Sequence, residues 1–146
     1  MKIRALVVDD SRVMRNLVMK SLRETELGEF EFFEAEDGKD ALDTLSLQPI
    51  DIMYVDWNMP NMSGVQFVAK VRSSERSKRT PIIMVTSERG IGKIEDALDR
   101  AGADAYITKP FTVDELKRQT EPLITKMTSP VSAPKSGGFF SKLIGG

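Results

Sequence analysis

The sequence predicts an α/β fold built on an open, doubly wound sheet of five parallel strands. Short apolar runs alternate five times with segments whose apolar residues recur at helical spacing. Strands that alternate with helices need crossover connections, and these favour a parallel sheet that is covered on both faces. At 146 residues the chain is long enough for one domain. It is too short for a closed eight-stranded barrel, which needs about 250 residues.

The first two strand and helix pairs lie in the first third of the chain. Residues 5–8 are rich in β-branched side chains and predict a strand, and Ser11 stands where a helix N-cap belongs. Residues 30–35 predict the second strand, and residues 38–47 predict a helix with one apolar face.

The later elements continue the alternation. They are predicted as strand 52–55, a helix ending near residue 72, strand 81–88, helix 94–101, strand 104–108 and helix 112–127. Thr112 is the expected cap of the last helix, and Pro122 inside it predicts either a kink or an early end. Gly90 and Gly92 weaken the start of the fourth helix.

Composition excludes several classes of chemistry. The chain has no cysteine and no histidine, so acid, base and metal chemistry depends on carboxylates, lysines and hydroxyl groups. A formal net charge of -1 gives no electrostatic footprint for nucleic acid. The apolar run near the N-terminus is too short for a signal-peptide core, and no run approaches a membrane span. We therefore expect a cytoplasmic protein that binds neither nucleic acid nor membrane.

Reactive side chains follow the predicted strands at the point where each strand ends. They are Asp9 and Asp10 after the first strand, Asp56 after the third, Thr86 and Ser87 at the end of the fourth, and Lys109 after the fifth. In open parallel sheets, ligands bind beyond the carboxyl ends of the strands. These side chains are therefore expected on one rim.

A rim of this composition suits phosphoryl chemistry. Crowded carboxylates repel one another, and Mg²⁺ with its preference for oxygen ligands relieves that repulsion. A lysine and a threonine hydroxyl can contact phosphoryl oxygens, and a carboxylate can act as the nucleophile. Asp56 is thus the candidate acceptor of a phosphoryl group.

Four motifs carry a resemblance to a known family. "VVDDS", "DWNMPNMSG", "MVTSE" and "YITKPF" occur in the order found in the receiver domain of two-component response regulators, and they resemble the chemotaxis members of that family most. The resemblance runs from about Lys2 to Met127 and implies a receiver domain over residues 1–127. It implies the flavodoxin-like strand order 2-1-3-4-5.

The same resemblance implies roles for the rim. Asp56 would be phosphorylated, and Mg²⁺ would be bound by Asp10, Asp56, the backbone carbonyl of Asn58 and, through water, Asp9. The remaining roles are implied as follows: Lys109, Thr86 and the amides near Trp57 and Ser87 would contact the phosphoryl group, Tyr106 would act with Thr86 as the switch aromatic, and Asn58 and Glu88 would tune dephosphorylation. The Lys109–Pro110 peptide bond is expected to be cis, which would direct Lys109 into the site.

The function expected from this resemblance is a stand-alone, monomeric switch rather than an enzyme. A histidine kinase would phosphorylate it, and it would then bind an output protein such as the flagellar motor switch in chemotaxis. A phosphate sink or a regulator outside motility remains an alternative. An aspartate-based phosphatase is disfavoured because it needs a second acid where Asn58 stands, and an FMN carrier because "DDSRVMR" would repel a phosphate. One extra residue within "RGIGK", relative to chemotaxis regulators, leaves the output face open.

The C-terminal segment has a different composition. Residues 128–138 are rich in Ser, Pro and Gly and predict a flexible linker. In residues 139–146, the side chains of Phe139, Phe140, Leu143 and Ile144 fall on one face of a short helix. Two interpretations stay open: a peptide that docks on a partner, or a tail that folds back on its own domain. A membrane anchor is disfavoured.

Overall fold

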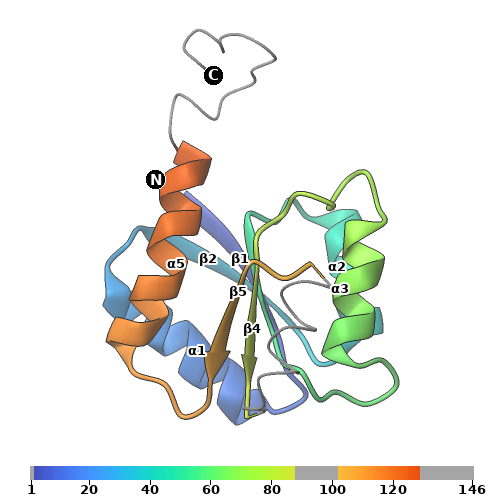
Figure 1. Cartoon of the computed structure of the whole chain (residues 1–146), viewed down its shortest axis with the longest axis horizontal. Coiled ribbons are helices and arrows are strands. Elements are labelled where there is room, and N and C mark those ends of the chain that lie inside the picture. The colour runs from blue at the N-terminus through green and yellow to red at the C-terminus, as the bar shows by residue number, and fades with distance from the viewer. Residues whose placement is uncertain (1, 88–101, 129–146) are drawn as a thin grey trace, which may run out of the picture.

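A computed structural model describes residues 2–87 and 102–128 of the chain (Figure 1). Its sheet has five parallel strands in the order β2-β1-β3-β4-β5, which confirms the predicted fold class and strand order. The strands are β1 (Lys2–Val8), β2 (Glu29–Ala35), β3 (Ile52–Val55), β4 (Ile82–Thr86) and β5 (Ala105–Thr108). The described helices are α1 (Arg12–Thr25), α2 (Gly38–Leu47), α3 (Gly64–Arg72) and α5 (Val113–Thr128). The predicted helix 94–101, Gly90, Gly92 and the tail from residue 129 lie outside the described residues.

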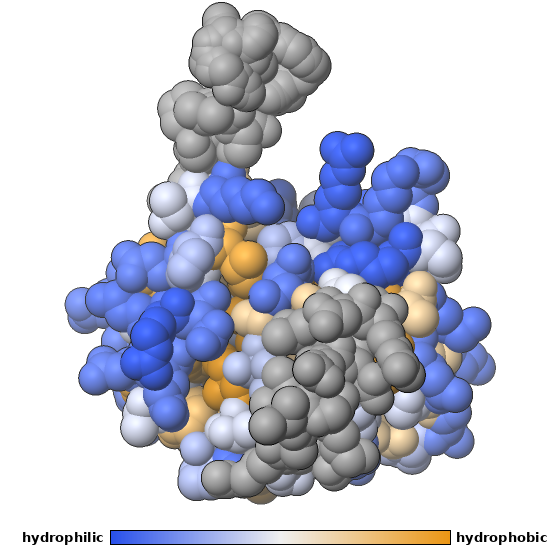
Figure 2. Space-filling model, in the orientation of Figure 1, coloured by the Kyte–Doolittle hydropathy of each residue, from blue (hydrophilic) through white to orange (hydrophobic). Residues whose placement is uncertain are grey.

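The helices cover both faces of the sheet. Helices α1 and α5 pack on one face and α2 and α3 on the other (Figure 1). Each face has its own apolar cluster, with Leu22 and Leu116 fully buried on one side and Phe67 and Val71 on the other. Figure 2 shows hydrophilic side chains over α5 and beyond the C-terminal end of α3, with hydrophobic surface between these two regions. Because all five strands are parallel, their carboxyl ends lie together at one end of the sheet.

Most element boundaries agree with the sequence patterns. Helix α2 and strand β3 begin and end at the predicted residues. Strand β1 begins at Lys2, three residues before the predicted start. The prediction began late because Arg4 interrupts the apolar pattern. The backbone N–H of Arg4 donates to Asp51 Oδ2 at 2.8 Å and its side chain pairs with the same carboxylate. A polar residue is thereby accommodated within the sheet.

Helix α5 continues through Pro122 to Thr128, so the predicted alternative of an early end is wrong. Thr112 caps the helix as expected, since its hydroxyl accepts from the N–H of Glu115 at 3.1 Å. Beyond the cap, Thr120 is fully buried and shares a hydrogen bond of 2.9 Å with the hydroxyl of Tyr54 in β3. Packing and this buried bond offset the helix hydrogen bond that a proline removes. In the described part of the chain, no helix is both long and apolar enough to cross a membrane.

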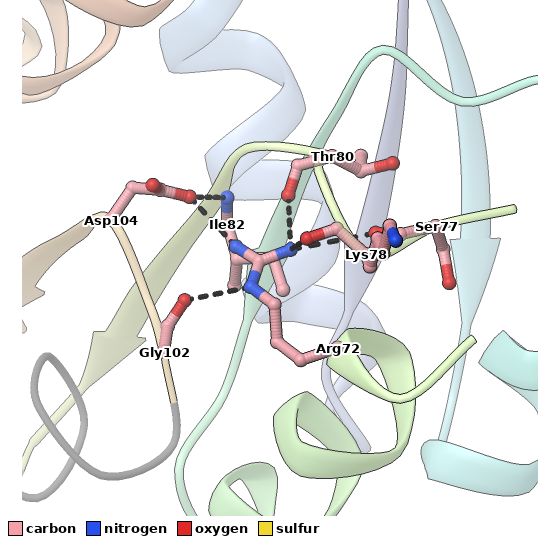
Figure 3. Close-up of polar contacts among 7 residues, drawn as sticks. All are labelled: Arg72, Ser77, Lys78, Thr80, Ile82, Gly102 and Asp104. Carbon is pink, nitrogen blue, oxygen red and sulfur yellow. Dashed lines mark hydrogen bonds and ion pairs between the residues drawn. The ribbon is translucent and has the colours of Figure 1, made fainter. Parts of the chain in front are cut away.

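The loops at the amino ends of β4 and β5 are joined by one side chain, that of Arg72 at the end of α3 (Figure 3). Its Nε donates to the Gly102 carbonyl at 2.9 Å, and Nη1 donates to the Thr80 carbonyl at 2.7 Å. Its Nη2 pairs at 2.9 Å with Asp104 Oδ2, which also accepts from the N–H of Ile82 at 2.8 Å. We refer to this network as the Arg72 clamp. It lies at the amino ends of the strands, whereas the predicted rim lies at their carboxyl ends.

Candidate functional site

The first two carboxylates of the site lie in the loop between β1 and α1. The backbone N–H of Asp9 donates to the Ala35 carbonyl in β2 at 3.1 Å, so the loop starts in sheet register. The buried carboxylate of Asp9 accepts from the N–H of Ser11 at 2.8 Å, and Ser11 in turn caps α1 through Met14 as predicted. Asp10 follows with an exposed side chain. The loop therefore presents one held carboxylate and one that faces solvent.

Asp56 directly follows β3, and only 7% of its surface is exposed. Its backbone N–H donates to the Val8 carbonyl at 2.9 Å. On the other side Gly64, the first residue of α3, donates to the Trp57 carbonyl at 2.8 Å. A Cβ at Gly64 would collide with the backbone oxygen of Asp56. The glycine thus lets the start of α3 lie directly against the backbone of the candidate acceptor.

Lys109 reaches both buried carboxylates from the end of β5. Its Nζ lies 3.1 Å from Asp9 Oδ2 and 3.2 Å from Asp56 Oδ1. The peptide bond between Lys109 and Pro110 is cis, as the resemblance implies. Residues from the first, third and fifth strands therefore meet at one point, as the strand ends predict.

The three carboxylates of Asp9, Asp10 and Asp56 form an acidic cluster, with one oxygen from each lying within 4.8 Å of the others. The Lys109 ammonium can balance only one of these negative charges. Burial, followed by the negative charge of Asp9, raises the pKa of Asp56 to about 6, although Lys109 opposes the shift. A set of oxygen donors with excess negative charge fits Mg²⁺, which binds through one or two carboxylates and several waters.

Two aromatic side chains lie beside the acidic cluster. Trp57 follows Asp56, is 8% exposed and belongs to the apolar cluster beneath α2 and α3. Its ring meets the half-buried ring of Tyr106 in β5 edge to face, with centroids 6.3 Å apart. The residue predicted as a switch aromatic is therefore in contact with the neighbour of the candidate acceptor.

The structure describes the other predicted site residues less fully. Asn58 lies exposed in the loop after Trp57, and Ser87 lies exposed just after β4. The backbone of Thr86 pairs with Thr108 at the end of β4. The side chain of Thr86, together with Glu88, Phe139, Phe140, Leu143 and Ile144, lies outside what the structure describes. The roles assigned to all of these residues stay predictions.

One contact at the rim has no counterpart in the sequence reasoning. Arg15 in α1 donates to the carbonyl of Asp9 and pairs with Glu34 at the end of β2. No motif links the two side chains, because they lie 19 residues apart on different elements. The parallel pairing of β1 with β2 and the packing of α1 against β2 bring them together.

Comparison with known proteins identifies relatives over most of the chain. The family profile of the response regulator receiver domain matches residues 5–121. A chemotaxis protein CheY homolog of Campylobacter jejuni is 42% identical over 82% of this chain and 90% of its own length. Chemotaxis protein CheY1 of Helicobacter pylori is 44% identical over 80% of this chain and 92% of its own length.

Solved structures show the same architecture. The chemotaxis response regulator CheY4 of Vibrio cholerae superposes with a TM-score of 0.75 at 32% identity, covering 84% of this chain and 99% of that one. The receiver domain of a sensor histidine kinase from Pseudomonas aeruginosa superposes with a TM-score of 0.74 at 27% identity, covering 85% of this chain and 98% of that one. That structure has a magnesium ion coordinated in its active site cleft.

Proposed function

Because the chain belongs to the response regulator receiver domain family, we propose that it is a CheY-like switch that accepts a phosphoryl group on Asp56 from a histidine kinase. Receiver domains are regulatory switches, and this one would bind its partners according to its phosphorylation state. The matched chemotaxis proteins align over nine-tenths or more of their own length. That coverage supports a CheY-like role for the receiver domain of this chain.

The observation that carries the proposal is the bridge made by Lys109. One ammonium lies within hydrogen-bonding distance of both Asp9 and Asp56, while Asp10 is close enough to complete the acidic cluster. A structural ion pair would need one carboxylate for one lysine. An excess of buried carboxylates beside a single lysine is instead typical of a site that binds a cation and then an anionic group.

In the proposed reaction, an oxygen of Asp56 attacks the phosphorus of a phosphohistidine on the kinase. The new O–P bond forms as the P–N bond breaks, and the electron pair of that bond stays on the imidazole nitrogen of the kinase. The acidic cluster and the carbonyl of Asn58 would hold Mg²⁺, and a bound Mg²⁺ would supply positive charge for the phosphoryl oxygens. Lys109 exchanges its contact with Asp56 for one with a phosphoryl oxygen.

The remaining assignments follow the same scheme. The hydroxyl of Thr86 and the amides near Trp57 and Ser87 hold phosphoryl oxygens. Movement of Thr86 toward the phosphoryl group then gives Tyr106 room to turn inward. Hydrolysis of the aspartyl phosphate by water resets the switch, at a rate tuned by Asn58 and Glu88.

The partners proposed for this switch are a histidine kinase and an output protein of the chemotaxis class, such as the flagellar motor switch. The names of the matched relatives support that choice. The proposed location is the cytoplasm, where both partners of such a pathway meet, and the proposed state is a monomer.

The acceptor is tested by treating the protein with acetyl phosphate, with and without Mg²⁺, and locating the label by mass spectrometry of peptides. We expect labelling of Asp56 that requires Mg²⁺ and is lost in Asp56→Asn, which keeps the shape and removes the nucleophile. Asp43→Asn is the matched control, because Asp43 is an exposed carboxylate on α2, away from the acidic cluster. Normal labelling of Asp56→Asn would disprove the assignment.

The output is tested separately, by recovering bound proteins from a lysate with and without beryllofluoride, which mimics the phosphoryl group. A switch gains or loses a flagellar or other output protein when beryllofluoride is present. A phosphate sink exchanges phosphoryl groups with its kinase and shows no such change.

A further inference from the structure

Arg15 contacts the backbone of the acidic cluster from beneath. The residue lies in the first turn of α1, and only 15% of its side chain is exposed. Its Nη1 donates to the main-chain carbonyl of Asp9 at 2.7 Å, and its Nε pairs with Glu34 Oε1 at 2.9 Å. A surface arginine would lose much side-chain entropy in such a fixed arrangement. The Asp9 carbonyl and Glu34 together hold the Arg15 side chain in one conformation.

The carbonyl that Arg15 holds belongs to the peptide group shared by Asp9 and Asp10. A peptide group is planar, so its oxygen, its nitrogen and the two flanking Cα atoms move together. The Asp9 N–H is already fixed on the Ala35 carbonyl. With the carbonyl oxygen also held by Arg15, the position of the Asp10 Cα is restricted. The exposed Asp10 side chain has no such support of its own from a hydrogen bond or ion pair within residues 2–87 and 102–128.

On this geometry, and resting on the function proposed above, we infer that Arg15 is a positioning residue for the Asp10 carboxylate in Mg²⁺ binding, and that Glu34 holds Arg15 in place. Arg15 acts through the peptide plane and touches neither the metal nor the phosphoryl group. Partners that orient metal ligands in this way typically change metal affinity by roughly 10- to 100-fold.

Glu34 has a second effect on the same pair. A guanidinium beside a cation site repels the cation, and a carboxylate at 2.9 Å balances that charge. The pair can therefore hold the backbone without adding net positive charge at the rim.

The inference predicts an effect opposite in sign to simple electrostatics, and this makes the test sharp. Removal of a positive charge near a cation site strengthens cation binding if charge alone matters. Removal of the contact with the Asp9 carbonyl weakens binding if position matters.

The experiment measures Mg²⁺ affinity by calorimetry and by Trp57 fluorescence in the wild type and in Arg15→Ala, Arg15→Lys and Arg12→Ala. Arg12 is the matched control, because it lies on the same turn of α1, carries the same charge, is exposed, and makes no hydrogen bond or ion pair with the described residues. We expect roughly tenfold weaker binding in Arg15→Ala and unchanged or slightly tighter binding in Arg12→Ala. Arg15→Lys keeps the charge and one donor, so it should recover part of the lost affinity.

A second measurement separates positioning from general damage. At saturating Mg²⁺, Arg15→Ala should be labelled by acetyl phosphate at close to the wild-type rate, because the contacts of Asp56 with Lys109 do not involve Arg15. A thermal melt of each variant checks folding, and if Arg15→Ala does not fold, Arg15→Lys and Glu34→Gln are compared with Arg12→Ala in its place.

The outcomes are distinguishable. If Arg15→Ala binds Mg²⁺ as tightly as Arg12→Ala while the wild type binds Mg²⁺ and is labelled, the role of Arg15 is disproved and the proposed function stands. A labelling rate that stays low at saturating Mg²⁺ also overturns the positioning role. If the wild type binds no Mg²⁺ and takes no label, the proposed function itself fails and the inference fails with it.

Discussion

At the scale of single residues, Asp56 is under two opposing influences. Burial and the charge of Asp9 favour the protonated carboxyl, whereas Lys109 favours the ionised form, and the first two dominate because the pKa is raised from 3.8 to about 6. Ionisation of Asp56 therefore lowers the stability of the metal-free folded protein, and the size of this effect depends on pH.

The first prediction concerns stability without metal. Because the folded protein holds the Asp56 proton more tightly than the unfolded chain does, ionisation of Asp56 lowers the free energy of unfolding as pH rises from about 3.8 to about 6. In EDTA, Asp56→Asn should be more stable than the wild type at pH 7.5, by up to about 3 kcal/mol. The advantage should disappear near pH 4. Urea unfolding of both proteins at both pH values measures the difference in the free energy of unfolding. Equal stability of the two proteins at pH 7.5 would contradict the raised pKa of Asp56.

The second prediction concerns Mg²⁺. The metal requires ionised carboxylates, so its affinity should be constant well above pH 6 and should fall roughly tenfold per pH unit below it. Calorimetric titration between pH 5 and pH 8 should also show proton release near pH 6. In Asp56→Asn this pH dependence should be absent. Retention of the same fall in that variant would place the titrating group elsewhere.

At the scale of elements, the starts of α2 and α3 offer a direct comparison. Each helix begins with a buried glycine at its first position, Gly38 and Gly64, after a capping Asp37 or Ser63. An added Cβ at Gly38 would approach the thioether sulfur of Met62 at 2.6 Å, which is part of a flexible side chain. At Gly64 it would collide with the backbone oxygen of Asp56, which cannot move without moving the site.

The third prediction follows from that contrast. Gly64→Ala should lower the free energy of unfolding by about 2 to 3 kcal/mol, because backbone must shift to admit the methyl group. Gly38→Ala should lower it by less than about 1 kcal/mol. Denaturant unfolding of the two variants gives the comparison, and labelling by acetyl phosphate should be slowed only in Gly64→Ala. Equal losses of stability would show that the start of α3 can move away from Asp56.

The same elements show how far sequence patterns reach. Helix α2 and strand β3 have the predicted bounds because apolar spacing and a cap define them locally. The meeting of Asp9, Asp56 and Lys109 was also predictable, because parallel strand ends share one edge. The pairing of Arg15 with Glu34 was not, since it depends on strand pairing and on the packing of α1 against β2 rather than on any local pattern. Helix α5 passes Pro122 for a similar reason: tertiary contacts of Thr120 override a local preference.

At the scale of the whole molecule, the chain divides its tasks between two ends of the sheet. The carboxyl ends hold the acidic cluster and Lys109, and the amino ends hold the Arg72 clamp. Helix α5 packs on α1 and runs away from the carboxyl ends of the strands (Figure 1). It ends at Thr128, the last described residue. The residues proposed as linker and docking peptide continue from that helix.

The fourth prediction concerns those residues. Deletion of residues 136–146 should leave the rate of labelling by acetyl phosphate unchanged, because every residue of the acidic cluster is retained. If the apolar face of the tail docks on a partner, recruitment of that partner should weaken, and Phe140→Ala should reproduce part of the loss. Each buried apolar side chain contributes about 1.5 to 3 kcal/mol before the cost of ordering. Unchanged recruitment with a lower melting temperature would favour a tail folded on its own domain.

The Arg72 clamp also sets where the molecule resists exchange of its amide hydrogens. Ile82 and Asp104 are joined twice, by the N–H of Ile82 on Asp104 Oδ2 and by the N–H of Asp104 on the Ile82 carbonyl, each at 2.8 Å. Arg72 Nη2 donates to the same carboxylate oxygen that accepts from the N–H of Ile82, so it stabilises the closed arrangement of this segment. We expect deuterium uptake at these two amides to be slow and insensitive to beryllofluoride, which acts at the other end of the strands, and to become fast in Arg72→Met. The two amides thus provide an internal reference for exchange rates, against which changes in deuterium uptake elsewhere in the chain on phosphorylation can be compared.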